Sequence, residues 1–253
     1  MSAVDVVRTN VLDRTEVEAL QGWVDGIEAW PAGSHRWGHY AEATPRGPAI
    51  CRTENVSACH GGIASLVQGV LHDCAADAIG ATVVAFKDKV NYKQRGGAGF
   101  RPHQDAVAYP GVRRVMSVLL AIDDCSLESG CLWLADGVDE VLPVDDRGVV
   151  RSDVADGLGW YPAELRAGDA VCIDGFAPHY SEANRTDGAR RVVVASYAPA
   201  ADGYTREHYY AARHDTMQRA SAQDGRFRIS TLADFEGTEV DVETIVGDHC
   251  THP

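Results

Sequence analysis

The chain has 253 residues, a hydrophobic share of 45% and a formal net charge of −14 at pH 7. This charge argues against nucleic acid or an anionic membrane as a partner, and no apolar run is long enough to cross a bilayer. The N-terminus has no basic and apolar signal segment, and the seven cysteines include no Cys-x-x-Cys pair, so we expect a protein of the reducing cytoplasm.

The first third of the chain predicts two helices. Thr15-Glu-Val-Glu18 has the form of a capping box, and apolar residues follow it at helical spacing, which predicts a helix over residues 15–28. Residues 31–49 carry Gly, Pro, His and aromatic residues without a clear period, and they indicate a loop or an irregular strand. Apolar residues at helical spacing then predict a second helix over about 60–78.

From residue 82 onward the pattern is typical of β-structure. Short apolar or alternating runs bounded by turn residues predict strands at 82–86, 87–93, 113–122, 131–135, 170–173 and 192–197. A polar insertion occupies 137–162, and residues 203–222 have a helical composition. Several short strands after a helical part indicate a mainly β fold with flanking helices (α+β), of the double-sheet jelly-roll type. We expect one domain over 1–253, with a helical part at about 14–80, a jelly-roll core at about 82–200, and a C-terminal helix and tail at 201–253.

A Gly-rich loop leads into the segment Phe100-Arg-Pro-His-Gln-Asp105. On a β-strand, residues two apart face the same side, so His103 and Asp105 would point into one space. They would supply two of the three protein ligands of a non-haem Fe(II) centre, and His179, in a polar loop after the strand 170–173, would supply the third. A surface loop with two polar residues is the alternative for His103 and Asp105 taken alone. The loop glycines are not followed by Gly-Lys-Ser/Thr, which argues against a phosphate-binding loop.

These segments resemble the Fe(II)/2-oxoglutarate oxygenases of the phytanoyl-CoA dioxygenase-like family. The matching residues are His103-Gln104-Asp105, His179 followed by Ser181 and Asn184, and Arg190. The resemblance implies a double-stranded β-helix of the cupin type, iron bound by His103, Asp105 and His179, and Arg190 paired with the far carboxylate of 2-oxoglutarate. Arg suits that role because it is always charged and bidentate. Residues 129–137 depart from the family pattern, so no role is transferred to that loop.

Three further residues are candidates for contacts to 2-oxoglutarate. Asn91 and Lys93 face the same side of the strand 87–93, and Ser181 lies two residues after His179. The resemblance implies a reaction in which Fe(II), 2-oxoglutarate and O2 hydroxylate an unactivated C–H, with release of succinate and CO2. Related halogenases have Gly or Ala at the position of Asp105, so its presence favours hydroxylation.

The substrate is less well defined by the sequence. The run from Lys87 to Tyr109 is most similar to family members that act on small polar molecules, including aminoalkylphosphonates and natural-product intermediates, rather than on an acyl-CoA. We therefore expect a small zwitterionic or anionic substrate, held in part by Arg95 or Arg101. The candidate substrate residues are Arg101, Gln104, Tyr109, Trp133, Glu54 and Asn55.

Two alternatives remain open at the level of sequence. The same metal centre would serve desaturation, cyclisation or epimerisation, since the outcome depends on substrate placement within about an ångström. A non-catalytic cupin-type protein that binds a metal or a ligand is the other alternative, although such a protein needs no residue like Arg190 for 2-oxoglutarate. We expect a small-molecule substrate, and the sequence indicates no oligomeric state.

Overall fold

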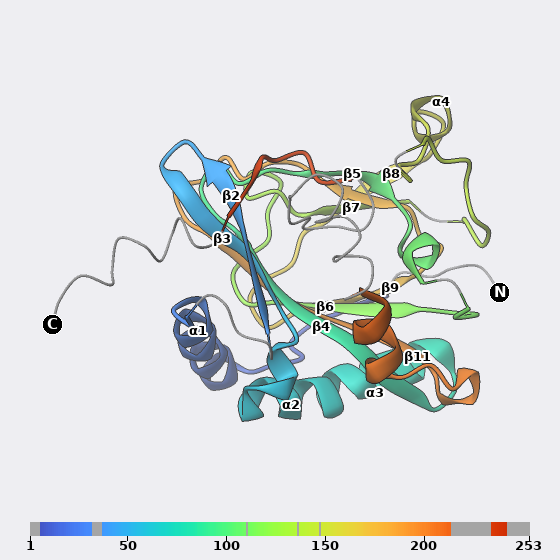
Figure 1. Ribbon diagram of the computed structural model, residues 1–253, viewed down its shortest axis with the longest axis horizontal. Coiled ribbons are helices and arrows are strands. Elements are labelled where there is room, and N and C mark those ends of the chain that lie inside the picture. The colour runs from blue at the N-terminus through green and yellow to red at the C-terminus, as the bar shows by residue number, and fades with distance from the viewer. Residues whose placement is uncertain are drawn as a thin grey trace, which may run out of the picture.

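Two antiparallel sheets lie face to face, and three helices cover the outer side of the larger sheet (Figure 1). The computed structural model describes residues 6–31, 37–109, 111–135, 137–146, 148–213 and 234–241, and the fold is given for these. The larger sheet has eight strands, in the order β1 (Val6–Arg8), β9 (Ala170–Asp174), β6 (Met116–Ala121), β11 (Arg190–Pro199), β4 (Val83–Lys93), β3 (Gly47–Glu54), β2 (Gly38–Thr44) and β12 (Glu239–Val240). The smaller sheet has four, in the order β5 (Phe100–His103), β10 (His179–Ser181), β7 (Leu132–Ala135) and β8 (Trp160–Ala163).

Helix α1 (Arg14–Glu28) lies where the sequence predicts a helix, but its cap is different. Asp13 is the N-cap: its side chain accepts from the Glu16 amide (2.9 Å), and the Glu16 side chain accepts from the Asp13 amide (2.8 Å). The predicted capping box of Thr15 and Glu18 is therefore wrong, because Asp is at least as good an N-cap as Thr and starts the helix earlier.

The predicted helix over 60–78 is in fact two helices, α2 (Gly61–Gln68) and α3 (Val70–Ile79). The helical conformation is interrupted at Gly69, which has φ −106° and ψ −112° and donates its amide hydrogen to the Ser65 carbonyl. A Cβ at this position would lie 2.7 Å from the Ser65 carbonyl oxygen. Glycine therefore permits the turn between the helices, which apolar spacing alone does not reveal.

Alternation along the central strands divides the apolar core into two layers. Val118 and Leu120 of β6 pack in one cluster with the helices, whereas Leu119 and Ala121 pack in another with the smaller sheet. The inner face of the large sheet thus looks toward the small sheet, and the candidate site lies between them.

Several other boundaries differ from the sequence prediction. The segment 31–49, expected as a loop or irregular strand, contains β2 and the start of β3, which form a hairpin. Cross-strand pairing holds this hairpin, and such pairing leaves little trace in the local pattern. The predicted strands 82–86 and 87–93 form the single strand β4, and the insertion at 137–162 contains α4 (Ser152–Ala155) and the start of β8. Residues 206–213 are helical, while the rest of the predicted helix beyond 213 and the tail beyond 241 lie outside the described residues.

The prediction of a mainly β, double-sheet jelly roll with flanking helices is confirmed. Within the described ranges, no helix combines the length and the apolar character needed to cross a membrane.

Candidate active site

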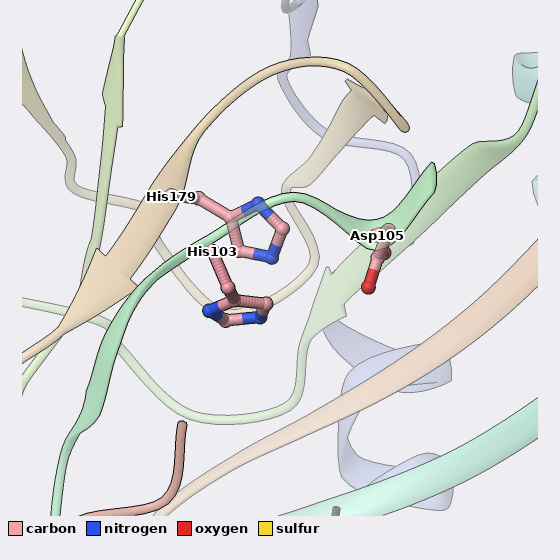
Figure 2. A group of neighbouring side chains, drawn as sticks. All are labelled: His103, Asp105 and His179. Atoms are coloured by element: carbon pink, nitrogen blue, oxygen red, sulfur yellow. The ribbon is translucent and has the colours of Figure 1, made fainter. Parts of the chain in front are cut away.

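Three side chains that the sequence singles out for a metal come together between the sheets (Figure 2). His179 begins β10 and lies directly opposite His103, the last residue of β5. Asp105 begins a 3-10 turn (Asp105–Ala108) rather than continuing the strand. Gln104 between them is extended, with φ −123° and ψ 129°, so His103 and Asp105 still face the same side. The ligand atoms of His103, Asp105 and His179 all lie within 4.8 Å of one another.

Both imidazoles are held through Nδ1 by a backbone carbonyl. His103 Nδ1 lies 2.7 Å from the Arg101 carbonyl oxygen, and His179 Nδ1 lies 3.0 Å from that of Ala177. A carbonyl oxygen only accepts, so each Nδ1 carries a proton, and Nε2 is the atom that each ring can present to a metal. Burial, with the neighbouring His103, lowers the pKa of His179 to about 4, so this ring is neutral near pH 7.

The Asp105 carboxylate is ionised. Burial alone would raise its pKa, but His179, Lys87 and Lys89 outweigh burial and lower the pKa of Asp105 well below its usual range. The Ser117 hydroxyl donates to Asp105 Oδ2 at 2.7 Å and orients the carboxylate. Two imidazole nitrogens and one carboxylate, with the remaining side open to a cavity, fit a non-haem Fe(II) centre.

His103, Asp105 and His179, which we call the metal group, line a cavity of about 1090 Å³, including its open mouth. Strand β4 forms one wall with four alternating side chains that all reach the cavity, namely Lys87, Lys89, Asn91 and Lys93. Asp105 and Ser117 lie near one end of this row, and Arg190 near the other. The cavity is therefore polar along one strand and has two separate groups of basic residues.

The first basic group consists of Arg190 and Lys93, which are paired across β11 and β4. Lys93 Nζ donates to Ser181 Oγ at 2.8 Å, and Arg190 Nη2 donates to the Gly130 carbonyl at 2.6 Å. Arg190 Nε is buried and has no acceptor among the described residues. A buried donor without an acceptor is costly, so this end of the cavity suits a carboxylate.

The second group, which we call the basic cluster, consists of Arg52, Lys87, Lys89 and Arg213, and all four line the cavity. Lys87 Nζ donates to the Tyr109 hydroxyl at 2.8 Å. Arg213 pairs with buried Glu54 at 2.7 Å, and Arg52 approaches the same carboxylate at 3.6 Å. In the described part of the chain, the Lys89 ammonium has neither a hydrogen bond nor an ion pair.

Burial lowers the pKa values of the two lysines of the basic cluster. It is the largest cause that lowers the pKa of Lys87 to about 8, although Glu54 and Asp105 act in the opposite direction. Burial, Arg52 and Lys87 together lower the pKa of Lys89 well below its usual value. A bound anion would raise both pKa values again, because it favours the charged form of each lysine.

The structure brings together some predicted residues and separates others. Asn91, Lys93, Ser181, Arg190 and Tyr109 line the cavity with the metal group. The other five predicted substrate residues do not line the cavity. Glu54 is buried and forms ion pairs with Arg213 and Arg52. The remaining four are Arg101, Gln104, Trp133 and Asn55.

These four residues have other partners. Gln104 is fully buried, and its amide bonds to the Glu140 carbonyl (2.9 Å) and accepts from the Leu142 amide (2.8 Å), so it braces the loop after β7. Trp133 stacks on Tyr180, with ring centroids 5.8 Å apart. Arg101 lies 3.8 Å from Glu236, and Asn55 accepts from Arg206. Arg95, the other expected anion-binding residue, pairs with exposed Asp187.

Sequence reasoning placed Lys87 and Lys89 among the basic residues near the site but did not identify Arg52, Arg213 or Asp234, which also line the cavity. Lys87 and Lys89 were accessible to it, because they continue the alternation that singles out Asn91 and Lys93. Arg52, Arg213 and Asp234 come from distant segments, and no local pattern marks them.

Comparison with known proteins agrees with this geometry. The sequence model of the family "Phytanoyl-CoA dioxygenase (PhyH)" matches residues 5–192. The chain is 36% identical over 230 residues to a methylphosphonate hydroxylase of Gimesia maris, covering 89% of this chain and 88% of that protein. It is 31% identical over 211 residues to a 2-aminoethylphosphonate dioxygenase of an uncultured bacterium, covering 81% and 80%.

Solved structures share the fold. EctD from S. alaskensis, with 2-oxoglutarate and 5-hydroxyectoine, aligns with a TM-score of 0.67 at 20% identity, covering 79% of this chain and 73% of that one. The epimerase SnoN, in complex with Fe3+, alpha ketoglutarate and nogalamycin RO, aligns with a TM-score of 0.65 at 21% identity, covering 78% and 80%.

Proposed function

Because this chain belongs to the phytanoyl-CoA dioxygenase family and is an oxygenase that uses Fe(II), 2-oxoglutarate and O2, we propose that it hydroxylates a small organophosphonate. We assign His103, Asp105 and His179 to the iron, and Arg190, Lys93, Ser181 and Asn91 to 2-oxoglutarate. With iron and the co-substrate bound, the centre would activate O2, which oxidises 2-oxoglutarate to succinate and CO2 and hydroxylates an unactivated C–H. Membership of an oxygenase family sets aside the alternative of a non-catalytic binding protein.

The basic cluster is the observation that carries the choice of substrate. The protein has a net charge of −14, yet Arg52, Lys87, Lys89 and Arg213 converge on the cavity that contains the metal group. Glu54 neutralises the two arginines in part, whereas the Lys89 ammonium has no hydrogen bond or ion pair within the described ranges. A phosphonate has three acceptor oxygens and suits such a group of charged donors.

The two relatives with phosphonates in their names support the same class of substrate. Methylphosphonate has one carbon, so its hydroxylation takes place on the carbon bonded to phosphorus. In this chain the lysines of the basic cluster lie close enough to Asp105 to shift its pKa. A phosphonate held by those lysines would keep its first carbon beside the metal group.

Some residues of the chain orient the metal ligands, and others line the cavity. Ser117 holds the Asp105 carboxylate, and the backbone carbonyls of Arg101 and Ala177 hold the two imidazoles. Leu119, Ile173 and Val194 line the cavity between the two basic groups and limit the access of water. The six cysteines among the described residues are free thiols, which supports a reducing, cytoplasmic setting as part of this proposal.

The test is turnover with methylphosphonate and 2-aminoethylphosphonate, with acetate and β-alanine as carboxylate controls. Succinate release and a new phosphorus resonance by 31P NMR are expected with the phosphonates alone. The variant Lys89→Gln is expected to raise the KM for the phosphonate about 10- to 100-fold, the loss of one charge-assisted contact, while the KM for 2-oxoglutarate changes less than about twofold.

Arg113→Gln is the matched control, because Arg113 is an exposed cation paired with Asp202 outside the cavity. Equal effects of Lys89→Gln and Arg113→Gln would argue against the basic cluster as the phosphonate site. Succinate release that is no faster with phosphonates than with carboxylates would contradict the proposed function itself.

A further inference from the structure

Asp234 is a buried carboxylate beside the metal group that the proposed roles leave unused. Its exposed fraction is 2%, and it lines the cavity. Its Oδ2 lies 3.3 Å from His103 Nε2, and its Oδ1 has no hydrogen-bond partner in the part of the chain that the structure describes. Asp234 precedes Phe235, which bridges to Phe100 at the start of β5 and so holds Asp234 in place.

Metal binding would remove the one partner of the Asp234 side chain among the described residues, His103 Nε2. His103 already donates its Nδ1 proton to the Arg101 carbonyl, so a neutral, metal-binding ring has only a lone pair at Nε2. In that state His103 offers no proton to Asp234. A buried carboxylate without a donor or a cation is strongly unfavourable, so this position would favour a cationic partner in the loaded enzyme.

The metal ion does not meet this need directly. The described group whose ligand atoms lie within 4.8 Å of one another contains His103, Asp105 and His179 but not Asp234. Asp234 is therefore not a fourth ligand in this arrangement. The charge of a divalent ion is also balanced already by Asp105 and by 2-oxoglutarate.

The other carboxylates near the cavity have partners. Glu42 accepts the Ala98 amide at 2.9 Å. Glu54 is paired with Arg213 and Arg52, and Asp105 accepts from Ser117. Asp234 is thus the carboxylate best placed to receive a cation carried by a ligand.

We infer that Asp234 binds the ammonium group of the substrate and selects an aminoalkylphosphonate over an alkylphosphonate. This inference rests on the proposed function, and it adds the second charged group of the substrate. Asp234 Oδ2 lies 3.3 Å from His103 Nε2, whereas Lys87 and Lys89 lie near enough to Asp105 to lower its pKa. A substrate with a phosphonate at one end and an ammonium at the other would lie across the metal group, with its carbons between.

The test compares 2-aminoethylphosphonate with propylphosphonate, in which a methyl group replaces the ammonium. Binding is measured by anaerobic calorimetry on the full-length protein loaded with Mn(II) and 2-oxoglutarate, and kcat/KM is measured with Fe(II). The wild type is expected to prefer 2-aminoethylphosphonate about 100-fold, which is the range for one buried charge-assisted contact. Asp234→Asn is expected to abolish that preference through weaker binding of 2-aminoethylphosphonate, and propylphosphonate should change less than about threefold.

Two further variants complete the test. Asp234→Glu keeps the charge and is expected to keep a preference of at least about tenfold. Glu236→Gln removes an exposed carboxylate two residues away, outside the cavity, and is expected to change nothing. The affinity for Mn(II) is measured in each variant, because a carboxylate that only positions His103 would alter metal binding and both phosphonates alike.

The outcomes separate the two levels of the argument. Equal loss of both phosphonates in Asp234→Asn, or no preference for the ammonium in the wild type, would overturn the role of Asp234. That second result needs no variant and holds even if Asp234→Asn does not fold. If alkylphosphonates are hydroxylated without discrimination, only this inference fails; if no phosphonate binds or reacts, the proposed function fails and the inference falls with it.

Discussion

The Arg190 guanidinium has one buried donor, Nε, without an acceptor among the described residues, while Nη2 donates to Gly130. We expect Arg190→Lys to weaken 2-oxoglutarate binding about 10- to 100-fold, because a lysine cannot form the planar, two-point contact with a carboxylate. The measurement is an anaerobic titration of the Fe(II)-loaded protein with 2-oxoglutarate, followed by the weak visible charge-transfer band.

Arg191→Lys is the control for that titration. Arg191 faces the opposite side of β11, where it pairs with Asp123 (2.7 Å) and Asp25. If Arg191→Lys weakens 2-oxoglutarate binding as much as Arg190→Lys does, the assignment of Arg190 is wrong.

We expect Lys87 to make substrate binding depend on pH. Its pKa is lowered to about 8, chiefly by burial, so above pH 8 the free protein holds Lys87 largely neutral. A bound anion favours the charged form and raises that pKa. Binding of methylphosphonate near pH 8.5 should therefore take up protons, and its affinity should fall as the pH rises through this range.

Calorimetry in two buffers with different ionisation enthalpies measures this proton uptake. Lys87→Arg remains charged at all these pH values, so it should take up fewer protons and show a flatter pH dependence. Proton release, or the same uptake in Lys87→Arg as in the wild type, would show that Lys87 does not titrate with binding.

At the scale of elements, the turn before β7 supports the end of the cavity that we assign to 2-oxoglutarate. Gly130 has φ +75°, and a Cβ there would lie 2.3 Å from the Glu182 carbonyl and 3.1 Å from Lys93 Nζ. The Gly130 carbonyl also accepts from Arg190. Gly130→Ala should therefore destabilise the fold by more than the ~1–2 kcal/mol of a left-handed alanine and should also weaken 2-oxoglutarate binding.

Gly137→Ala provides the comparison, since Gly137 has φ +79° but no atom within 4 Å of its added Cβ. It should lose only the ~1–2 kcal/mol of backbone strain, with 2-oxoglutarate binding unchanged. Denaturant unfolding and the same anaerobic titration give both quantities. Equal losses in the two variants would mean that the close approach at Gly130 has no effect on the site.

Strand β4 also shows how far the sequence can predict this site. Alternation alone assigns Asn91 and Lys93 to one face, and the same rule reaches Lys89 and Lys87. The metal motif was predictable for a similar reason, because a two-residue spacing on extended chain has a fixed geometric meaning. His179 was predicted from its polar loop after the strand 170–173 and was then matched to the family motif, because nothing local indicates that its strand pairs with β5.

Other features depend on contacts that the sequence does not display. Arg213 reaches the cavity through its ion pair with Glu54, more than a hundred residues earlier in the chain. Asp234 reaches it because Phe235 bridges to Phe100. The hairpin of β2 and β3 has the same origin: its residues lack a clear period, and pairing within the large sheet makes them strands.

At the scale of the whole molecule, the charge is divided between surface and interior. The net charge is −14, while six basic side chains line the cavity, namely Arg52, Lys87, Lys89, Lys93, Arg190 and Arg213. Depressed lysine pKa values are the consequence of gathering these groups in a buried space. Two anions, 2-oxoglutarate and the substrate, would offset the positive charge of the two basic groups, and the metal ion would offset the negative charge of Asp105. The binding of all three should therefore be linked to the stability of the fold.

The metal group joins the two sheets, which makes its effect on stability measurable. His103 and His179 belong to the small sheet, and Asp105 is bonded to Ser117 of the large one. A ligand at 100 times its Kd stabilises the native state by about 2.7 kcal/mol. For a chain of this size that corresponds to a rise in Tm of about 5–10 °C, which we expect on addition of Mn(II) to metal-free protein.

The variants should divide this stabilisation into two parts. Asp105→Ala and His179→Ala should lose the rise caused by Mn(II), because each removes one of three ligands. Arg190→Ala should keep that rise but lose the additional increase on adding 2-oxoglutarate, since Arg190 lies at the far end of the cavity from Asp105. A full response to Mn(II) in either ligand variant would mean that the ion binds elsewhere, and the assignment of His103, Asp105 and His179 to the metal would have to be abandoned.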